Sequence, residues 1–196
     1  MRAERLAARR SVSEAERSAS DAAIVAAVAD IVGRLFGPRL TSESQDCAPL
    51  IAAYQPMRCE PGGAQLPETL ARLGVRVLLP VLRPDMDLDW AEYASAKSLV
   101  PASRGLQEPV GPRLGRSVLR RASAILVPAL AVDRQGRRLG RGGGSYDRAL
   151  ARRSPDVPVI ALLYDGDLVD EVPTEPHDQP VTAVITPSLG YLPLPG

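Results

Sequence analysis

The sequence predicts an α/β fold in three layers, α/β/α, with a mostly parallel central sheet in a single domain. Short apolar runs alternate with helical segments along the chain, which is the pattern of a parallel sheet covered by helices on both faces. A hydrophobic content of 45% over 196 residues can fill one full core. Because no repeat or linker divides the chain, residues 1–196 are predicted to form one domain, with helices over 1–36 and a loose tail over 187–196.

The N-terminal segments are predicted to be two helices. Arg2–Arg10 indicates a short basic helix, and Ser13 with Glu16 forms a capping box that begins a second helix. Gly37-Pro38 predicts the end of that helix. Its buried face is predicted from apolar residues at helical spacing: Ile24, Val28, Ile31, Val32 and Leu35.

The rest of the chain is predicted to alternate strands with short helices. Ala48–Tyr54 and Val75–Leu82 are apolar and indicate buried strands, and Leu66–Leu73 between them indicates a helix. Asp85–Tyr93 alternates weakly, which indicates a small antiparallel strand. The remaining predicted elements are a loop over Pro101–Gly115, a helix over Arg116–Arg121, and strands over Ala124–Val132, Val157–Tyr164 and Val181–Ile185.

Polar loops follow the ends of the predicted strands, over residues 55–63, 101–109, 133–145 and 165–178. In open parallel sheets the ligand crevice lies beyond the carboxyl ends of the strands. We therefore expect these loops to surround the functional site.

One of these loops is rich in glycine and arginine. Residues 136–144 read GRRLGRGGG, between an apolar strand and a helix that begins near Ser145. Strand, glycine-rich loop and helix start form an arrangement that binds phosphate, and arginine matches phosphate oxygens with two donors. The loop is not a Walker A motif, and Ser145 stands where a dinucleotide fingerprint has its third glycine. The alternative is a flexible surface loop, which the density of arginines makes the weaker interpretation.

Other polar residues support two interpretations each. Asp147 is either an aspartate that favours the start of a helix or a Mg²⁺ ligand beside phosphate. His177 is the only histidine, and a lone histidine in a loop is more often structural or solvated, although this one could sit in the crevice. Asp178 beside it could be a second metal carboxylate. Glu60 alone is more often a surface charge, and Trp90 is more often a packing residue.

Composition excludes several classes of protein. A net charge of +1 gives no electrostatic reason to expect nucleic acid or a membrane as partner. Cys47 and Cys59 lack metal-ligand spacing, so neither zinc nor a disulfide framework is indicated. No signal peptide or membrane span is indicated, and a cytoplasmic location is expected.

Residues 125–150, ILVPALAVDRQGRRLGRGGGSYDRAL, resemble the signature of the 5-formyltetrahydrofolate cyclo-ligase family. That signature is a strand ending in proline, a hydrophobic-Asp turn, and then R-hydrophobic-G-x-G-x-G-Y-Y-D. The resemblance extends over essentially the whole chain. The other segments that fit are Ser13–Arg17, Tyr54–Glu60, Asp89-Trp90, Arg104–Pro109 and Pro173–Asp178.

The resemblance implies an enzyme that cyclises 5-formyltetrahydrofolate to 5,10-methenyltetrahydrofolate. The implied reaction consumes ATP with Mg²⁺, passes through a phosphorylated formyl group, and releases ADP and phosphate. The implied partners are these small molecules, and a monomer is expected. Two other functions stay open: an enzyme of the sugar-phosphate isomerase or acyl transferase type, and a non-catalytic nucleotide- or folate-binding relative.

The resemblance also implies roles for individual residues. Arg141 and Tyr146 are the implied catalytic residues, and Asp147 and Asp178 the implied Mg²⁺ ligands. The implied ATP-binding residues are Arg2, Arg138, Leu139, Gly140, Arg141, Gly142, Gly143, Gly144, Ser145 and Tyr146. The implied substrate-binding residues are Gln55, Glu60, Arg141, Gly142, Gly143, Gly144 and Ser145.

The sequence departs from the family pattern at two positions. The first helix of the family carries K-x-x-x-R, and aligning on Ser13 places the arginine at Arg2 and the lysine ahead of Met1. Either the sequence begins late or the protein lacks that lysine. Ser145 replaces the first tyrosine of Y-Y-D, which removes a ring from the folate side.

Overall fold

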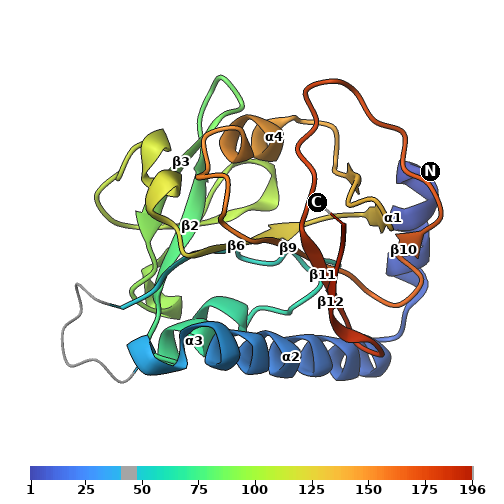
Figure 1. The fold of residues 1–196 in the computed structure, drawn as a ribbon, viewed down its shortest axis with the longest axis horizontal. Helices are drawn as coiled ribbons and strands as arrows, with labels where there is room; N and C mark the ends of the chain where they lie inside the picture. The colour runs from blue at the N-terminus through green and yellow to red at the C-terminus, as the bar shows by residue number, and fades with distance from the viewer. Residues whose placement is uncertain (41–47, 196) are drawn as a thin grey trace.

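The predicted α/β fold is confirmed by the computed structural model, which describes residues 1–40 and 48–195. Within these residues, a seven-stranded sheet forms the centre (Figure 1). The central strands are parallel, and only the two edge strands, β12 and β3, pair antiparallel with their neighbours. In spatial order the strands are β12 (Gly190–Pro193), β11 (Ala183–Thr186), β9 (Val159–Leu162), β6 (Ala124–Pro128), β1 (Leu50–Ala52), β2 (Arg76–Leu82) and β3 (Leu88–Glu92).

Helices cover both faces of this sheet and complete the three layers. The long helix α2 (Glu14–Leu40) and the short α3 (Leu66–Arg72) lie against one face. The opposite face carries α4 (Ser145–Leu150) and the 3₁₀ helix η4 (Arg116–Arg121). None of the helices in the described part of the chain is long and apolar enough to cross a membrane.

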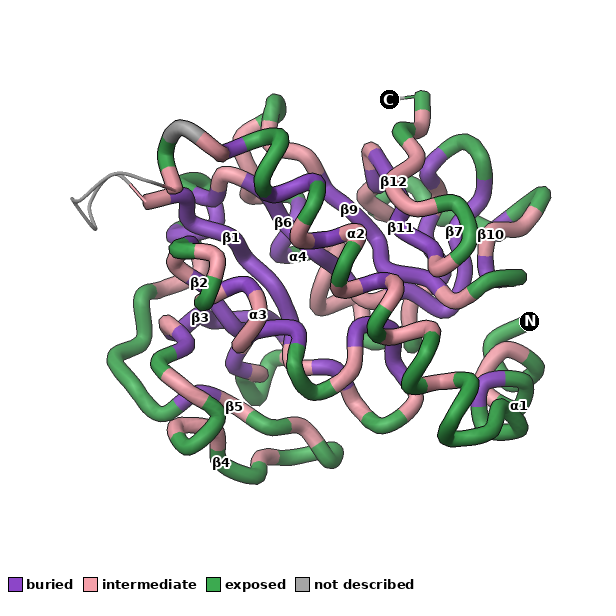
Figure 2. Tube along the Cα trace, turned by 90° about the horizontal axis from the view of Figure 1, so that it is seen from below, coloured by how far each residue is buried: buried purple, intermediate pink, exposed green. Residues whose placement is uncertain are grey.

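Alternating side chains of each strand fill two separate cores. On β6, Leu126 joins the core beneath α2, whereas Ile125 and Val127 join the core beneath α4 and η4. Successive side chains of a strand point to opposite faces, so a strand covered on both sides is apolar at every position. Figure 2 shows this as continuous buried stretches along the central strands. Trp90 is fully buried in the second core, which confirms its interpretation as a packing residue.

The N-terminal helices agree largely with the prediction. Helix α1 spans Arg2–Ser11, and the capping box before α2 is formed, because Glu16 N donates to Ser13 Oγ at 3.2 Å and Ser13 N donates to Glu16 Oε2 at 3.1 Å. Helix α2 continues four residues beyond the predicted limit at residue 36. Leu35 is exposed and Phe36 is buried instead, since the buried stripe follows i, i+4 steps from Val28.

One strand prediction and one loop prediction were wrong. Ala124–Val132 is not one strand, because the chain leaves the central sheet after Pro128 and residues 131–133 form β7 (Ala131–Asp133). That strand lies in a small sheet between β10 (Leu168–Val169) and β8 (Arg138–Leu139). The predicted loop 101–115 contains part of a hairpin, β4 (Leu99–Pro101) with β5 (Gln107–Pro109).

The predicted loose tail over residues 187–196 was also wrong. Residues 190–193 form the edge strand β12, which pairs with β11 after a tight turn at Gly190. The antiparallel pairing places β12 at an edge of the sheet, where proline is tolerated.

The Asp133 side chain connects the small sheet to the loop before residue 173. Its ionisation should make the free energy of unfolding depend on pH. Its buried carboxylate accepts bonds from the backbone N–H groups of Gln135, Arg137 and Val172, each at 3.0 Å, and pairs with the Arg137 side chain. Burial alone would raise the pKa of Asp133, but these hydrogen bonds outweigh it and lower the pKa below its ordinary value.

We expect Asp133→Asn to lower the free energy of unfolding at pH 7 by about 1–3 kcal/mol. A carboxylate whose pKa is lowered in the folded state adds its full contribution to the free energy of unfolding above its unfolded pKa, which is about 3.9. That contribution is lost as the pH falls through the folded pKa. Urea unfolding of wild type and variant should therefore differ at pH 7 and converge in strong acid. The exposed Asp170→Asn serves as control, and an equal difference at both pH values would contradict the prediction.

Candidate active site

A cleft of about 970 Å³ opens beyond the carboxyl ends of the parallel strands. Tyr54 follows β1, Leu82 ends β2, and Pro128 ends β6, and all three line it. This is the location that the rule for parallel sheets predicts. The small sheet and helix α1 close one side of the cleft, and the β4–β5 hairpin borders another.

The structure brings every residue predicted for the site into this one cleft. Its lining contains Arg2 from α1, Gln55 and Glu60 from the loop after β1, and Asp178 from the loop before β11. It also contains the whole segment from the small sheet into α4: Arg138, Leu139, Gly140, Arg141, Gly142, Gly143, Gly144, Ser145, Tyr146 and Asp147.

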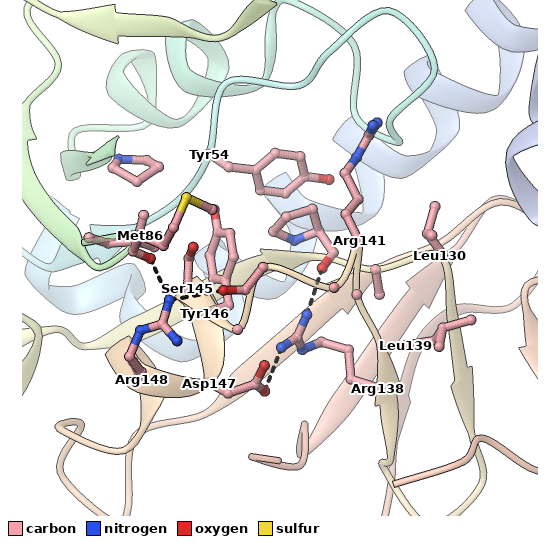
Figure 3. Close-up of a pocket in the computed structure, with 18 of the residues that line it drawn as sticks. Tyr54, Met86, Leu130, Arg138, Leu139, Arg141, Ser145, Tyr146, Asp147 and Arg148 are labelled. Atoms are coloured by element: carbon pink, nitrogen blue, oxygen red, sulfur yellow. Dashed lines mark hydrogen bonds and ion pairs between the residues drawn. The ribbon is translucent and has the colours of Figure 1, made fainter. Parts of the chain in front are cut away.

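In the glycine loop, residues 140–144, two glycines lie close to arginine side chains. A Cβ on Gly140 would lie 2.9 Å from the Arg138 guanidinium, and one on Gly144 would lie 2.9 Å from that of Arg148. Gly144 also has a φ of +64°, which disfavours any residue with a Cβ. Arg148 bridges the carbonyl oxygens of Gly143 and Met86 (Figure 3). Arg148 therefore connects the glycine loop to the turn that contains Met86.

Arg138 and Asp147 form a buried ion pair at the base of the cleft (Figure 3). Arg138 Nη2 donates to Asp147 Oδ1 at 2.6 Å, and the two side chains are only 4% and 15% exposed. Asp147 also accepts a bond from the backbone N–H of Gln179 at 3.3 Å. The buried Nε of Arg138 has no partner within the described residues. The sequence-based alternatives for Asp147 did not include this ion pair.

Arg141 and Glu60 connect two walls of the cleft. Arg141 Nε donates to Glu60 Oε1 at 3.0 Å, although 81 residues separate them. The other carboxylate oxygen of Glu60 accepts the backbone N–H of Met57 at 3.0 Å. Glu60 is buried, so the interpretation of an isolated surface charge is wrong.

Two tyrosines in the cleft are held as neutral phenols. Burial, followed by the nearby charge of Glu60, raises the pKa of Tyr146 well above its ordinary value. The same two causes raise the pKa of Tyr54, whose hydroxyl donates to the carbonyl oxygen of Pro61 at 2.6 Å. At neutral pH both groups can donate a hydrogen bond but cannot act as a base.

The residues present fit Mg²⁺ only together with oxygen ligands from a bound substrate. Within the described residues, no group of three His, Cys, Asp or Glu side chains could hold a metal. Asp147 and Asp178 supply two carboxylates to the cleft, and Mg²⁺ in nucleotide sites typically uses one or two carboxylates plus phosphate oxygens. His177 is exposed, lines the cleft, and lies 3.6 Å from Glu175 and 3.8 Å from Asp178.

Comparison with known proteins identifies the family. The sequence profile of the 5-formyltetrahydrofolate cyclo-ligase family matches residues 1–187. The chain belongs to this family.

Relatives of the cyclo-ligase family match nearly the whole chain. A 5-formyltetrahydrofolate cyclo-ligase of Mycolicibacterium smegmatis is 43% identical over 191 residues, which cover 95% of this chain and 91% of the relative. The NMR structure of the 5,10-methenyltetrahydrofolate synthetase of Aquifex aeolicus superposes with a TM-score of 0.74 at 24% identity, covering 100% of this chain and 91% of the other. The synthetase of Mycoplasma pneumoniae gives 0.72 at 20% identity, covering 95% and 96%. The protein is thus an enzyme of a ligase family with the fold of these synthetases.

Sequence reasoning missed several residues of this cyclo-ligase cleft. Arg104 lies on the hairpin with a φ of +59° and makes no hydrogen bond or ion pair with any described residue. Met86 lies in the turn before β3 with a φ of +62°, and its methyl group would contact a Cβ on Gly143 at 3.1 Å. Arg104 lies in a loop that was predicted to surround the site, although no role was predicted for it, whereas Met86 was not predicted at all because it reaches the cleft only through the turn before β3. The apolar residues of the lining include Met57, Pro80, Leu82, Leu88 and Leu106.

Proposed function

We propose that this protein catalyses the ATP- and Mg²⁺-dependent cyclisation of 5-formyltetrahydrofolate to 5,10-methenyltetrahydrofolate. The observation that carries the proposal is that one cleft contains two chemically different walls. A glycine and arginine wall suited to phosphate faces a partly apolar wall that contains Glu60. The membership in the cyclo-ligase family supports the same reaction.

The chemistry requires both substrates to be held together. The formyl oxygen attacks the γ-phosphorus of ATP, and ADP leaves. Nitrogen 10 of the folate then attacks the formyl carbon, loses its proton, and the carbon–oxygen bond breaks as phosphate leaves. Little covalent chemistry falls to the protein, so positioning and charge neutralisation carry the catalysis.

The glycine wall is suited to the triphosphate. We propose that backbone N–H groups of residues 140–144 and the guanidinium of Arg141 bind phosphate oxygens, with Arg2 beside them. Arg2 Nε donates to the carbonyl oxygen of Gly140 at 3.0 Å, so α1 already contacts this wall. Tyr146 is proposed to donate a hydrogen bond as a neutral phenol, which agrees with its raised pKa.

The opposite wall is suited to the folate. Gln55 and Glu60 are proposed to bind polar edges of the substrate, with Met57 and Leu106 against its rings. Phosphate binding to Arg141 would release Glu60 Oε1 from the ion pair, and that oxygen could then accept a hydrogen bond from folate. Ser145 takes the place of a ring, and the Met86 methyl group lies close to the neighbouring Gly143.

Asp147 and Asp178 are the residues proposed to hold Mg²⁺. When bound, the ion neutralises charge on the triphosphate. Asp147 would exchange part of its bond to Arg138 for the ion, and the Arg138 guanidinium would remain beside the phosphates.

The direct test is product formation by the purified protein. With 5-formyltetrahydrofolate, Mg²⁺ and ATP, we expect the absorbance of the methenyl product to grow with equimolar release of ADP. Replacing ATP with a non-hydrolysable analogue should abolish the product. Folded protein that binds both substrates without forming product would contradict the proposal and favour a non-catalytic relative.

A further inference from the structure

The loop of residues 57–63, which carries Glu60, is fixed by contacts from outside itself. The Tyr54 hydroxyl holds it from β1 through Pro61. On its other side, the backbone N–H of Gly62 donates to Asp21 Oδ1 at 3.0 Å. The Tyr164 hydroxyl lies 3.3 Å from the carbonyl oxygen of Glu60. Glu60 can face the cleft only while this loop keeps its place.

Asp21 is the point where three elements meet. It lies on α2, and the same carboxylate oxygen that binds Gly62 accepts the hydroxyl of Tyr164 at 2.9 Å, which follows β9. A Cβ on Gly63 would lie 3.2 Å from this carboxylate, so the loop packs directly against it. Burial raises the pKa of Asp21, against the opposing effect of the bonds from Tyr164 and Gly62. The packing of α2 against the sheet does not by itself require a half-buried aspartate that accepts two hydrogen bonds on one oxygen.

We call the contacts of Asp21 with Gly62 and Tyr164 the joint. Tyr164 connects this joint to helix α1, which carries Arg2. The Arg9 guanidinium lies over the Tyr164 ring, 5.5 Å from its centroid. Arg9 is buried and donates to Asp167 at 2.8 Å and to the carbonyl oxygen of Ala129 at 2.6 Å. One ring therefore contacts both the Glu60 loop and the anchor of α1.

We propose that Asp21 and Tyr164 are positioning residues that hold the Glu60 loop in the conformation in which Glu60 meets the folate substrate. The inference rests on the proposed function, since it assigns the loop to folate. Neither residue lines the cleft, so both act through Glu60. The loss of either contact should weaken the folate side of the site and leave the phosphate side largely intact.

The test compares three variants with a matched control. Asp21→Ala removes the acceptor, Tyr164→Phe removes the donor but keeps the ring on Arg9, and Asp21→Asn keeps an oxygen that can accept both bonds. The control is Asp30→Ala on the same helix, where an exposed aspartate pairs with Arg34 at the helix surface. We expect Asp21→Ala to raise KM for 5-formyltetrahydrofolate by about tenfold and Tyr164→Phe to raise it by less, with KM for ATP within about twofold of wild type. Asp21→Asn should restore most of the affinity.

A second measurement does not depend on activity. Hydrogen exchange of the peptide that spans residues 55–65 should speed up in Asp21→Ala and Tyr164→Phe but not in Asp30→Ala, because the Gly62 amide loses its acceptor or its support. If the wild-type protein formed no product, the proposed function would fail while the exchange result still tested the joint. Equal rises in both KM values, or faster exchange over the whole chain, would show a general structural role and overturn the inference.

Discussion

We expect Arg141→Ala to lower kcat/KM of the proposed cyclisation by about 100- to 1,000-fold, the usual cost of losing one preorganised donor to developing charge. Arg141 is the cleft arginine whose side chain is half exposed and whose Nε already binds a carboxylate across the cleft. Its removal also leaves Glu60 Oε1 without a partner. Both substrates are therefore affected, and the loss should appear in kcat as well as in KM.

The matched control is Arg134→Ala, an exposed arginine in the turn before the glycine loop that lies outside the cleft. Arg141→Lys provides a graded comparison, because lysine keeps the charge but lacks the planar fork that matches phosphate. The expected order of steady-state rates is wild type, then Lys, then Ala. Equal rates for Arg141→Ala and wild type would remove Arg141 from the site.

If Asp147 holds Mg²⁺ as proposed, we expect Asp147→Asn to raise the Mg²⁺ concentration for half-maximal rate by at least about tenfold, since loss of a group that supports a metal typically costs 10–100-fold. The substitution preserves shape but removes the charge that Mg²⁺ requires. It also leaves the buried Arg138 without its anionic partner, so some loss of stability accompanies it. Mg²⁺ titrations at saturating ATP separate the two effects, and thermal unfolding measures the second.

Two further variants test whether a shift in the Mg²⁺ titration is specific to the proposed Mg²⁺ ligands. Asp178→Asn should shift the Mg²⁺ titration in the same direction without the loss of stability, since Asp178 accepts only a backbone bond from Glu175 at 2.9 Å and a distant contact from His177. The exposed Asp156→Asn should leave the titration unchanged. A destabilised Asp147→Asn protein with an unchanged Mg²⁺ requirement would show that Asp147 serves only to balance Arg138.

Most of the fold could be predicted from the sequence because its signals are local. Each central strand is apolar on both faces, and the capping box of Ser13 and Glu16 needs only four residues. The errors fall where pairing partners are distant. The chain turns away at Pro128 because β7 pairs with β8 and β10, and β12 forms because β11 presents a free edge. A scan along the sequence cannot detect either partner.

The candidate site likewise contains features with a local sequence signal and features that depend on distant residues. Residues 138–147 are contiguous, so their composition alone indicated phosphate. The pairing of Arg141 with Glu60, the bond of Asp147 to Arg138 and the joint at Asp21 depend on how separate segments meet in space. Arg104 enters the cleft through the turn of a hairpin, and its unusual φ becomes visible only in the structure.

The docking of helix α1 has a consequence for biosynthesis. Arg9 and Asp167 are separated by 158 residues, and Arg2 and Gly140 by 138. A ribosome makes the N-terminus first, so α1 leaves the exit tunnel long before its anchor has been translated. Helix α1 therefore stays undocked through most of elongation. Docking it closes a large loop, and the buried ion pair of Arg9 and Asp167 has to offset the chain entropy that this costs. The wall that contains Arg2 is therefore completed only near the end of synthesis, and a nascent chain stalled before residue 167 would carry the glycine loop without the helix beside it.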